Sequence, residues 1–285
     1  MTEWAQRLAE FTARKEHEAR VAVPHPLTTE IDRATGDLKR IGNAWSERFF
    51  GGSFCVSPPR SADLPSTGLV FVRSREGNTG AADPETLGGG ATDKHLIYEG
   101  LSRVAADAVL AGAETVRSGD LVFSVWHTEM VSLRSALGYP RHPIQIVATL
   151  GGLALDRALL FNVPALRVIL LTVCEAEERM REALAARRWI TTLAMNQPAD
   201  LPHACRTLRQ WGVERVSAVG GRTMATALLD AGLVQDLYLT TSPRSAGEPN
   251  TPFYPRPLRT DLVTRKHGSG PEAGVVFEHL RVGTT

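Results

Sequence analysis

Two patterns of apolar and polar residues alternate along the chain from about residue 69 to residue 241. Short runs of aliphatic and β-branched residues are typical of buried strands. They lie at 69–74, 108–112, 143–149, 166–173, 215–219 and 236–242. Segments with apolar residues three or four positions apart, the spacing of an amphipathic helix, lie at 92–104, 175–187, 201–213 and 223–231. This alternation predicts a mainly parallel sheet with helices on both faces.

A few residues predict where these elements begin and end. Thr92 or Asp93 is the expected N-cap of the helix that follows. Gly232 is the expected left-handed stop of the helix at 223–231. Residues 258–282 alternate around a glycine-rich turn, which predicts an antiparallel hairpin at the C-terminal edge of the sheet.

The first 67 residues differ from the rest of the chain. Residues 3–20 predict a polar helix, and residues 21–67 show no sustained period and contain scattered Pro and Gly. This segment nevertheless holds Trp45, Phe49, Phe50 and Phe54, too many aromatic side chains for a free tail. We therefore expect an N-terminal arm, residues 1–67, that packs on the body or on a second subunit, and one α/β domain over residues 68–285.

Composition excludes several classes of protein. The 285 residues carry 32 basic and 31 acidic side chains, a formal charge of +1, with no block of one sign that would attract nucleic acid or a membrane surface. Apolar runs such as residues 168–173 are far shorter than the roughly 20 residues of a membrane-spanning helix. The N-terminus has no apolar signal region, so we expect a cytoplasmic protein. Three widely spaced cysteines argue against a disulfide framework and a cysteine metal site.

Gly220 and Gly221 stand where a predicted strand meets a predicted helix. Glycine lets a ligand approach the backbone closely, and a helix N-terminus favours phosphate. The alternative is a plain tight turn, because short glycine motifs often match by accident. Gly112 ends another predicted strand, and the carboxyl ends of parallel strands form one edge, where open sheets of this kind bind ligands. Two glycine features on one edge favour a nucleotide site.

Four stretches resemble one known family, the reductase domain of the bifunctional riboflavin-biosynthesis deaminase-reductase. They are "SREGNTG" at 74–80, "LSRVAADAVLAGAETVRSG" at 101–119, "VGGRTMATALLDAGLVQDLYLTTSP" at 219–243 and "PRSAGEPNTPFY" at 243–254. The resemblance covers about residues 69–282 and implies a dihydrofolate-reductase-like α/β fold. The zinc motifs of the family's deaminase half, His-x-Glu and Pro-Cys-x-x-Cys, do not occur in this chain, so we expect no deaminase activity.

The resemblance implies reduction of a ribosylamino-pyrimidine phosphate by hydride from NADPH, with the protein binding and orienting both reactants. Matching positions imply the cofactor contacts, which are Thr79, Gly112, Thr115, Gly220, Gly221, Arg222, Thr223 and Met224. The alternative for Thr115 is a cap or turn after the strand. The resemblance also implies a homodimer that acts on a small molecule.

The same resemblance implies that Ser74 and Arg103 contact the substrate, since a guanidinium suits a phosphorylated sugar. The alternative for Arg103 is an ordinary surface arginine. Glu76, in the same turn as Ser74, is read as a solvated loop acid. Arg117, Arg222 and Arg244 are equal candidates for the extra phosphate of NADPH.

Three positions depart from the family pattern: Val219 replaces a Glu, Gly119 replaces an Asp, and Trp126 lies near an expected basic substrate contact. Losing a hydrogen-bonding partner can change substrate discrimination by on the order of 10⁴. Besides the pyrimidine reductase, a dihydrofolate-type reductase and a paralogue that binds nucleotide without catalysis therefore remain open. A Rossmann-type binder is disfavoured because the glycines lack the G-x-G-x-x-G spacing.

Overall fold

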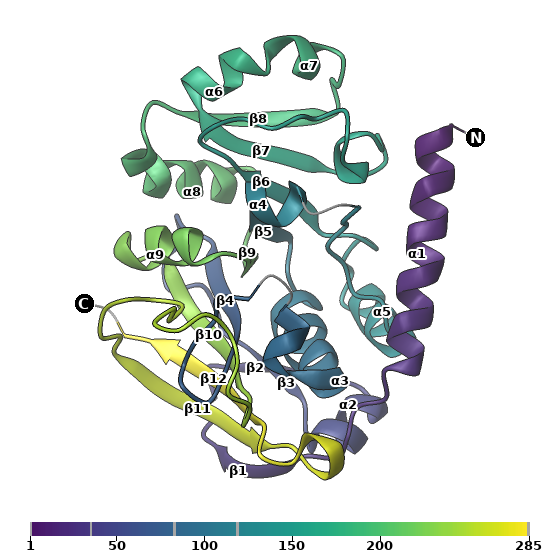
Figure 1. Ribbon diagram of the computed structural model, residues 1–285, viewed down its shortest axis with the longest axis vertical. Coiled ribbons are helices and arrows are strands. Elements are labelled where there is room, and N and C mark those ends of the chain that lie inside the picture. Colours follow the sequence, from purple (N-terminus) through teal and green to yellow (C-terminus); the bar gives the residue numbers. More distant parts are fainter. Residues whose placement is uncertain (1, 35, 82–83, 118–119, 284–285) are drawn as a thin grey trace.

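A computed structural model describes residues 2–34, 36–81, 84–117 and 120–283. Within these residues ten strands form one sheet, and helices cover both of its faces (Figure 1). Seven neighbouring strands run parallel; in spatial order they are β10 (Val234–Thr241), β4 (Ser66–Arg73), β9 (Arg215–Val219), β5 (Ala108–Gly112), β6 (Ile144–Ala148), β7 (Val168–Val173) and β8 (Ile190–Met195). The predicted mainly parallel sheet is confirmed.

Three antiparallel strands complete one side of the sheet. β12 (Val276–Val282) pairs with β10, and β11 (Thr260–His267) pairs with β12, so the predicted C-terminal hairpin is confirmed. Outside the hairpin lies β1 (Thr28–Asp32), which comes from the N-terminal segment and pairs with β11. A second, two-stranded sheet contains β2 (Lys39–Ile41) and β3 (Phe54–Val56).

Side chains that alternate along the parallel strands fill two apolar layers. Leu110 of β5 packs beneath α8 (Leu201–Gln210) and α9 (Arg222–Asp230) on one face. Val109 points to the other face, beneath η2 (Asp93–Arg103), a π-helix. The remaining helices are α1 (Glu3–Val21), α2 (Ala44–Phe50), α3 (Gly90–Thr92), α4 (Ala113–Arg117), α5 (Thr128–Ala136), α6 (Cys174–Arg179) and α7 (Arg181–Ala185), with short 3-10 turns η1 (Pro84–Leu87), η3 (Leu159–Phe161), η4 (Pro198–Asp200) and η5 (Gly270–Glu272).

The start of η2 differs from the expectation. Thr92 and Asp93 do not cap the helix, because α3 already begins at Gly90 and continues into η2. The Thr92 hydroxyl accepts from the backbone N–H of His25 at 3.1 Å instead, and the Asp93 carboxylate accepts from the Thr240 hydroxyl. The N-cap prediction is therefore wrong, and both side chains make long-range contacts. Gly232 has φ of 65°, which confirms the predicted left-handed stop of α9.

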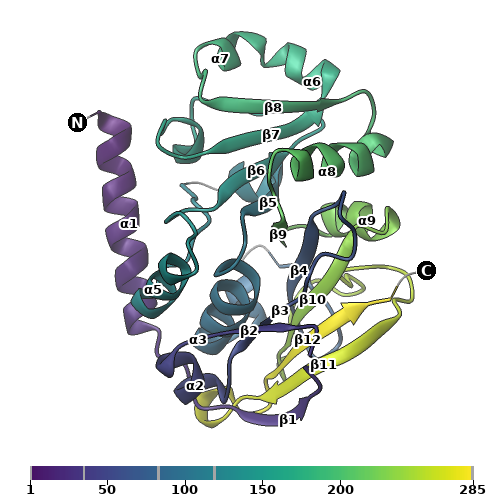
Figure 2. The same ribbon diagram turned by 180° about the vertical axis from the view of Figure 1, so that it is seen from behind.

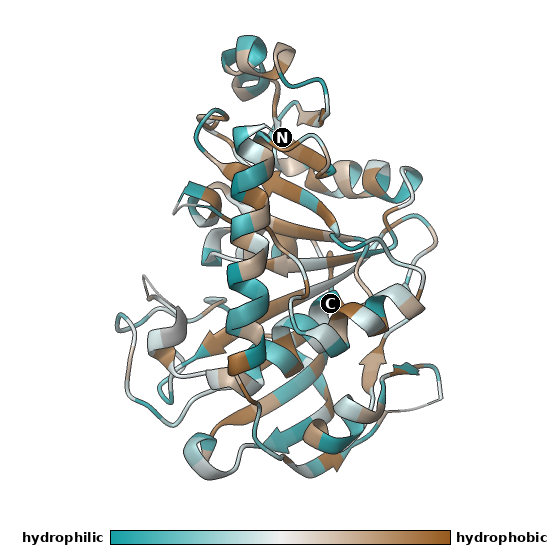
Figure 3. Cartoon of the chain, turned by 90° about the vertical axis from the view of Figure 1, so that its right-hand side faces the viewer, coloured by the Kyte–Doolittle hydropathy of each residue, from teal (hydrophilic) through white to brown (hydrophobic). Residues whose placement is uncertain are grey.

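The N-terminal segment contains α1, β1, β2, α2 and β3 where the sequence showed no period after the first helix. Phe50 and Phe54 are buried beneath η2, and a Cβ on Gly100 of that helix would overlap the Phe54 ring. From behind, Figure 2 shows β2 and β3 lying across the lower part of the body. Figure 3 shows α1 along the side of the molecule with a mainly hydrophilic outer surface. The Phe11 ring of α1 meets the Trp126 ring edge-on, with centroids 5.6 Å apart.

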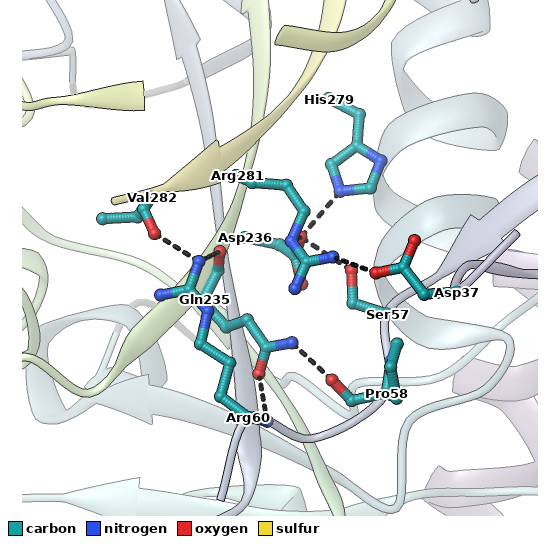
Figure 4. A network of polar contacts seen from close by, with 9 residues as sticks. All are labelled: Asp37, Ser57, Pro58, Arg60, Gln235, Asp236, His279, Arg281 and Val282. Atoms are coloured by element: carbon teal, nitrogen blue, oxygen red, sulfur yellow. Dashed lines mark hydrogen bonds and ion pairs between the residues drawn. The ribbon is translucent and has the colours of Figure 1, made fainter. Parts of the chain in front are cut away.

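A buried polar network connects the N-terminal segment to the amino end of β10 and to the adjoining carboxyl end of β12 (Figure 4). Asp236 Oδ1 accepts from Ser57 Oγ at 2.9 Å and lies 2.8 Å from His279 Nε2. Arg281 Nε lies 3.7 Å from the same carboxylate. Asp236 and His279 are almost completely buried, so these contacts replace the water that both groups would otherwise bind.

No described helix is both long and apolar enough to cross a bilayer. Within the described ranges, no group of three His, Cys, Asp or Glu side chains is arranged to hold a metal ion.

Candidate functional site

Two predicted motifs meet at the carboxyl ends of β5 and β9. These strands pair directly, Ala111 opposite Val219, and lead into α4 and α9. Gly220 has φ of 117°, which residues with a Cβ rarely adopt. A Cβ there would also lie 2.8 Å from Thr115 Oγ1 and 3.7 Å from the Gly112 nitrogen. The structure thus brings Gly112, Thr115 and the glycine pair together, and Gly220 allows their close contact.

Gly221 leaves the first turn of α9 open. It is the N-cap residue of that helix, it is exposed, and no heavy atom lies within 4 Å of the position of its missing Cβ. As a glycine, Gly221 has no side chain with which to cap α9. Arg222 and Thr223 are exposed beside it, whereas Met224 is partly buried against the apolar core. Unpaired backbone N–H groups at an exposed helix start are suited to bind an anion such as a phosphate.

The polar side chains of the turn after β4 form hydrogen bonds within the turn and with the segment that follows β10. Ser74 Oγ donates to Glu76 Oε2 at 3.0 Å and accepts from the Asn78 N–H at 3.3 Å. Thr79 donates both its N–H and its hydroxyl to the Thr251 carbonyl, at 2.8 and 2.9 Å. Ser74 therefore stabilises the turn internally, and Thr79 holds it against the segment that follows β10. The structure records no contact of either with the glycine pair in the described residues.

Glu76 belongs to an exposed part of the same turn. Hydrogen bonding from the Ser245 hydroxyl, assisted by backbone and Ser74 hydrogen bonds, lowers the pKa of the Glu76 carboxyl to about 2. The group is ionised throughout the neutral range, in agreement with the prediction of a solvated loop acid.

Arg103 lies at the other end of the sheet. η2 runs opposite to the strands that flank it, so its last residue is next to the amino end of β5, whereas Gly112 closes the carboxyl end. Arg103 Nη1 donates to the Ser124 carbonyl at 3.3 Å, and the guanidinium lies over the rings of Tyr98 and Phe123, 5.2 and 5.5 Å from their centres. Burial lowers the pKa of Arg103. The structure thus does not bring Arg103 together with the glycines.

The three candidate arginines for the extra phosphate occupy different places. Arg117 of α4 forms an ion pair with Glu114 and donates to the Gly152 carbonyl at 3.2 Å. The Arg244 side chain lies against Gly88, near the end of β10. Arg222 follows Gly221 directly and is exposed. Arg222 is therefore the candidate nearest in the chain to the open end of α9.

The positions that depart from the family pattern are apolar where the structure describes them. Val219 is buried at the end of β9. Trp126 is buried between Phe11 of α1 and Arg141, whose guanidinium lies 5.1 Å from its ring centre. Gly119 lies outside the described residues. Neither Val219 nor Trp126 offers a polar contact through a carboxylate or a cation.

A cavity of about 600 Å³ opens elsewhere, between the turn at 76–78, the face of β10 and β12, and residues 250–260. Its floor is apolar, formed by Leu237, Leu239 and Leu280, and its charged lining includes Arg265, which is paired with Glu278 at 2.8 Å. Neither Gly112 nor the glycine pair lines it. The cavity is thus separate from the edge of the sheet that carries Gly112 and the glycine pair.

Sequence reasoning missed a pair of buried carboxyl groups at the carboxyl end of β10. Asp93 accepts from the Thr240 hydroxyl, and Glu272 Oε1 accepts from the Thr92 N–H at 3.0 Å. Burial raises the pKa of Asp93 to about 7, and the nearby charge of Glu272 adds to this rise. The sequence signal was the run Gly88–Gly90, because a Cβ on Gly89 or Gly90 would collide with the Asp93 or Glu272 carboxyl group.

Comparison with solved structures supports the fold. A pyrimidine reductase-like protein from Corynebacterium diphtheriae aligns with a TM-score of 0.61 at 21% identity, over 80% of this chain and 96% of that one. RibD from Acinetobacter baumannii aligns with a TM-score of 0.59 at 19% identity, over 78% of this chain and 58% of that one. The riboflavin biosynthesis reductase Rib7 of Saccharomyces cerevisiae gives 0.53 at 17% identity, over 79% and 93%. These likenesses confirm the dihydrofolate-reductase-like α/β architecture.

Sequence comparison identifies the family. No curated protein matches the chain significantly. The family model described as the RibD C-terminal domain matches residues 84–270, a segment that includes β5, α4, the glycine pair and α9. With its motifs, its fold and this match in agreement, the chain belongs to the RibD C-terminal domain family, the reductase domain of riboflavin biosynthesis.

Proposed function

We propose that this protein is an NADPH-dependent reductase of the riboflavin-biosynthesis type, which reduces a ribosylamino-pyrimidine 5-phosphate or a related pterin-like compound. One observation carries the proposal: the exposed and uncapped start of α9 lies beside Thr115 at the carboxyl edge of a parallel sheet. Family membership and the location of ligand sites in open α/β sheets support it.

The residues present fit a dinucleotide. Gly221 and the first N–H groups of α9 would hold its pyrophosphate, and Thr115 and Gly112 would line the adjoining β5 side. Arg222 would contact the additional phosphate that distinguishes NADPH from NADH, since a guanidinium binds phosphate through paired hydrogen bonds. When bound, the cofactor supplies the hydride, while the protein fixes orientation and excludes water.

The first experiment is a fluorescence titration of NADPH with the wild-type chain, Gly221→Val and Gly36→Val. Gly36 is a matched control, because it too is exposed with no heavy atom within 4 Å of its Cβ position. We expect Gly221→Val to weaken binding by about 100-fold or more, as a side chain would occupy the phosphate approach. Unchanged affinity for Gly221→Val would contradict the assignment.

A second titration compares NADPH with NADH. We expect Arg222→Ala to weaken NADPH binding by roughly tenfold and to leave NADH binding unchanged. Equal effects on both nucleotides would exclude Arg222 as the contact of the extra phosphate and would return Arg117 and Arg244 to consideration.

A second candidate function is nucleotide binding without catalysis. The buried apolar side chains of Val219, at a position where the family resemblance implied a carboxylate, and of Trp126, near an expected basic contact, favour it. Loss of reduced-nicotinamide absorbance with a pyrimidine or dihydrofolate acceptor would support the reductase. Tight NADPH binding with no turnover across these acceptors would support the alternative.

The family resemblance also leads us to propose a cytoplasmic homodimer. Light scattering during size-exclusion chromatography distinguishes a dimer from a monomer of 30.9 kDa.

A further inference from the structure

A second cavity, of about 340 Å³, opens at the amino ends of β6, β7 and β8. Its lining includes four buried apolar residues, Ile144, Val168, Ile169 and Val213. Its volume is within the range of roughly 300–1,000 Å³ that is usual for pockets that bind small molecules. Because Gly221 follows the carboxyl end of β9, this cavity and the proposed nucleotide site stand at opposite ends of the parallel sheet.

Two tryptophan side chains line this cavity, which we call the indole cavity. Trp211 directly follows α8, is 44% exposed, and makes no ring contact with a described residue. Trp189 precedes β8, is half-buried, and donates its indole N–H to the Phe161 carbonyl at 3.2 Å, which fixes the ring. An exposed indole leaves a large apolar surface in water, and stacking against a planar ligand would cover it.

The indole cavity also presents a cation and a hydroxyl group. Arg167 and Thr191 line it and are exposed, and neither side chain forms a hydrogen bond or an ion pair with a described residue. The described residues that line the cavity include no acidic side chain. A free guanidinium binds phosphate through paired hydrogen bonds, and its charge complements an anion. The cavity thus combines aromatic surfaces with a site for one anionic group.

The cavity on the other face of β8 shows the opposite arrangement. It measures about 430 Å³, and its lining includes Glu177, Glu178, Arg181 and Thr192. There Arg181 forms an ion pair with Glu178, and the Thr192 hydroxyl donates to Glu177. The polar groups of that cavity therefore satisfy one another. Successive residues of a strand point to opposite faces, so the neighbouring Thr191 points into the indole cavity, where its hydroxyl is available to a ligand.

We propose that the indole cavity binds a nucleoside monophosphate. Trp211 stacks on the base, Arg167 binds the phosphate, and Thr191 forms a hydrogen bond with the sugar. Aromatic side chains stack on any base, since every base has a π-face, so the site selects a class of ligand rather than one base. This inference goes beyond the proposed reductase function and does not depend on it, because none of the residues proposed to bind NADPH lines the indole cavity.

Calorimetric titrations of the wild-type chain with AMP, adenosine and ribose 5-phosphate test the class of ligand. We expect saturable binding of AMP. We expect binding at least about tenfold weaker for adenosine, which lacks the phosphate, and for ribose 5-phosphate, which lacks the base. Absence of saturable AMP binding overturns the proposal. Adenosine binding as tight as that of AMP excludes the anion contact, and equally tight binding of ribose 5-phosphate excludes stacking, so either result also overturns it.

AMP titrations of variants test the location. We expect Trp211→Ala and Arg167→Ala, both at exposed positions, each to weaken AMP binding by about tenfold. We expect no change in Arg157→Ala, a control at another exposed arginine without a partner among the described residues, or in Gly221→Val, which alters the proposed NADPH site. Unchanged AMP affinity in both cavity variants, or a loss in Gly221→Val alone, overturns the proposal. Failure of the chain to bind NADPH would overturn the reductase and leave these outcomes to decide the indole cavity.

Discussion

The two ends of the parallel sheet differ in how their polar groups are used. At the amino ends, Arg134 of α5 is 1% exposed and donates to the carbonyls of Arg103, Val104, Ala106 and Pro140, so it closes the end of η2. At the carboxyl ends, Gly221 leaves backbone N–H groups open and Glu272 retains a bare oxygen. Arg134 thus joins several segments at the amino ends, although its own Nη2 and His279 Nδ1 also lack partners among the described residues. The open N–H groups at the carboxyl ends belong to the site that we propose for a nucleotide.

The two ends of β10 also differ in the polar groups that surround a buried aspartate. At one end Asp236 is surrounded by Ser57, His279 and Arg281 (Figure 4). At the other end Asp93 has one hydroxyl partner and a carboxyl neighbour. Two buried aspartates at opposite ends of β10, Asp236 on the strand itself and Asp93 on η2, therefore have different expected roles: Asp236 stabilises, because donors and a cation lie around it, whereas burial raises the pKa of Asp93.

The largest effect is expected from removing the Arg134 guanidinium. Arg134→Met leaves several buried carbonyl groups without donors, and each such loss costs about 1–3 kcal/mol. We expect a fall of about 3–5 kcal/mol in the free energy of unfolding. Urea denaturation measures it, with NADPH affinity of the remaining folded protein unchanged. A loss of NADPH binding without a loss of stability would reverse the roles of the two ends.

A second prediction concerns stability against pH. Because the folded state keeps the Asp93 proton up to about pH 7 while the unfolded state releases it near pH 4, the folded state binds more protons between these values. This group therefore makes stability fall as pH rises from 4 to 7, by on the order of a few kcal/mol. Asp93→Asn should remove this slope in paired thermal unfolding series. Identical slopes would show that Asp93 is ionised in the folded protein.

At the carboxyl ends of β5 and β9, Gly220→Ala should lower the free energy of unfolding by about 1–3 kcal/mol. Its Cβ would meet Thr115 Oγ1, and its φ of 117° strains any residue with a side chain. Urea denaturation measures the difference. A cost below about 0.5 kcal/mol, the usual scatter of surface substitutions, would mean that the two turns are not in contact.

The smallest expected effect is that of the neighbouring glycine. Gly221→Ala should change stability by only about 0.5 kcal/mol or less, because its φ of −53° is ordinary and its Cβ position is empty. The contrast between Gly220 and Gly221 therefore separates a glycine needed for packing from one needed for access. Equal losses in both variants would remove that distinction.

Much of the fold could be predicted because strands buried on both faces need continuous aliphatic residues. β7, at 168–173, is such a strand. β8 was missed because it lies at the edge and exposes Thr191, and β1 was missed because its sequence, TTEID, is mostly polar and exposed. Edge strands owe their pairing to a neighbour rather than to their own apolar period.

Part of the candidate site could likewise be predicted from the sequence, and part could not. Gly112, Thr115 and the glycine pair could be predicted because each lies at a strand end, and parallel pairing brings those ends together. The position of Arg103 at the opposite end of the sheet could not be predicted from the sequence, because it depends on the direction in which η2 runs. The hydrogen bond between Thr92 and Glu272 joins positions 180 residues apart, and no local sequence pattern predicts it.

The pairing of β10 has a practical consequence for shortened versions of the protein. A fragment cut at the limits of the family match, residues 84–270, would lose β4 and β12, the two strands that flank β10. Its unpaired backbone would then be free to recruit strands from other molecules, and insoluble material would follow. Removing β1 alone would uncover β11 in the same manner, so a well-behaved fragment should extend at least from residue 28 to residue 282.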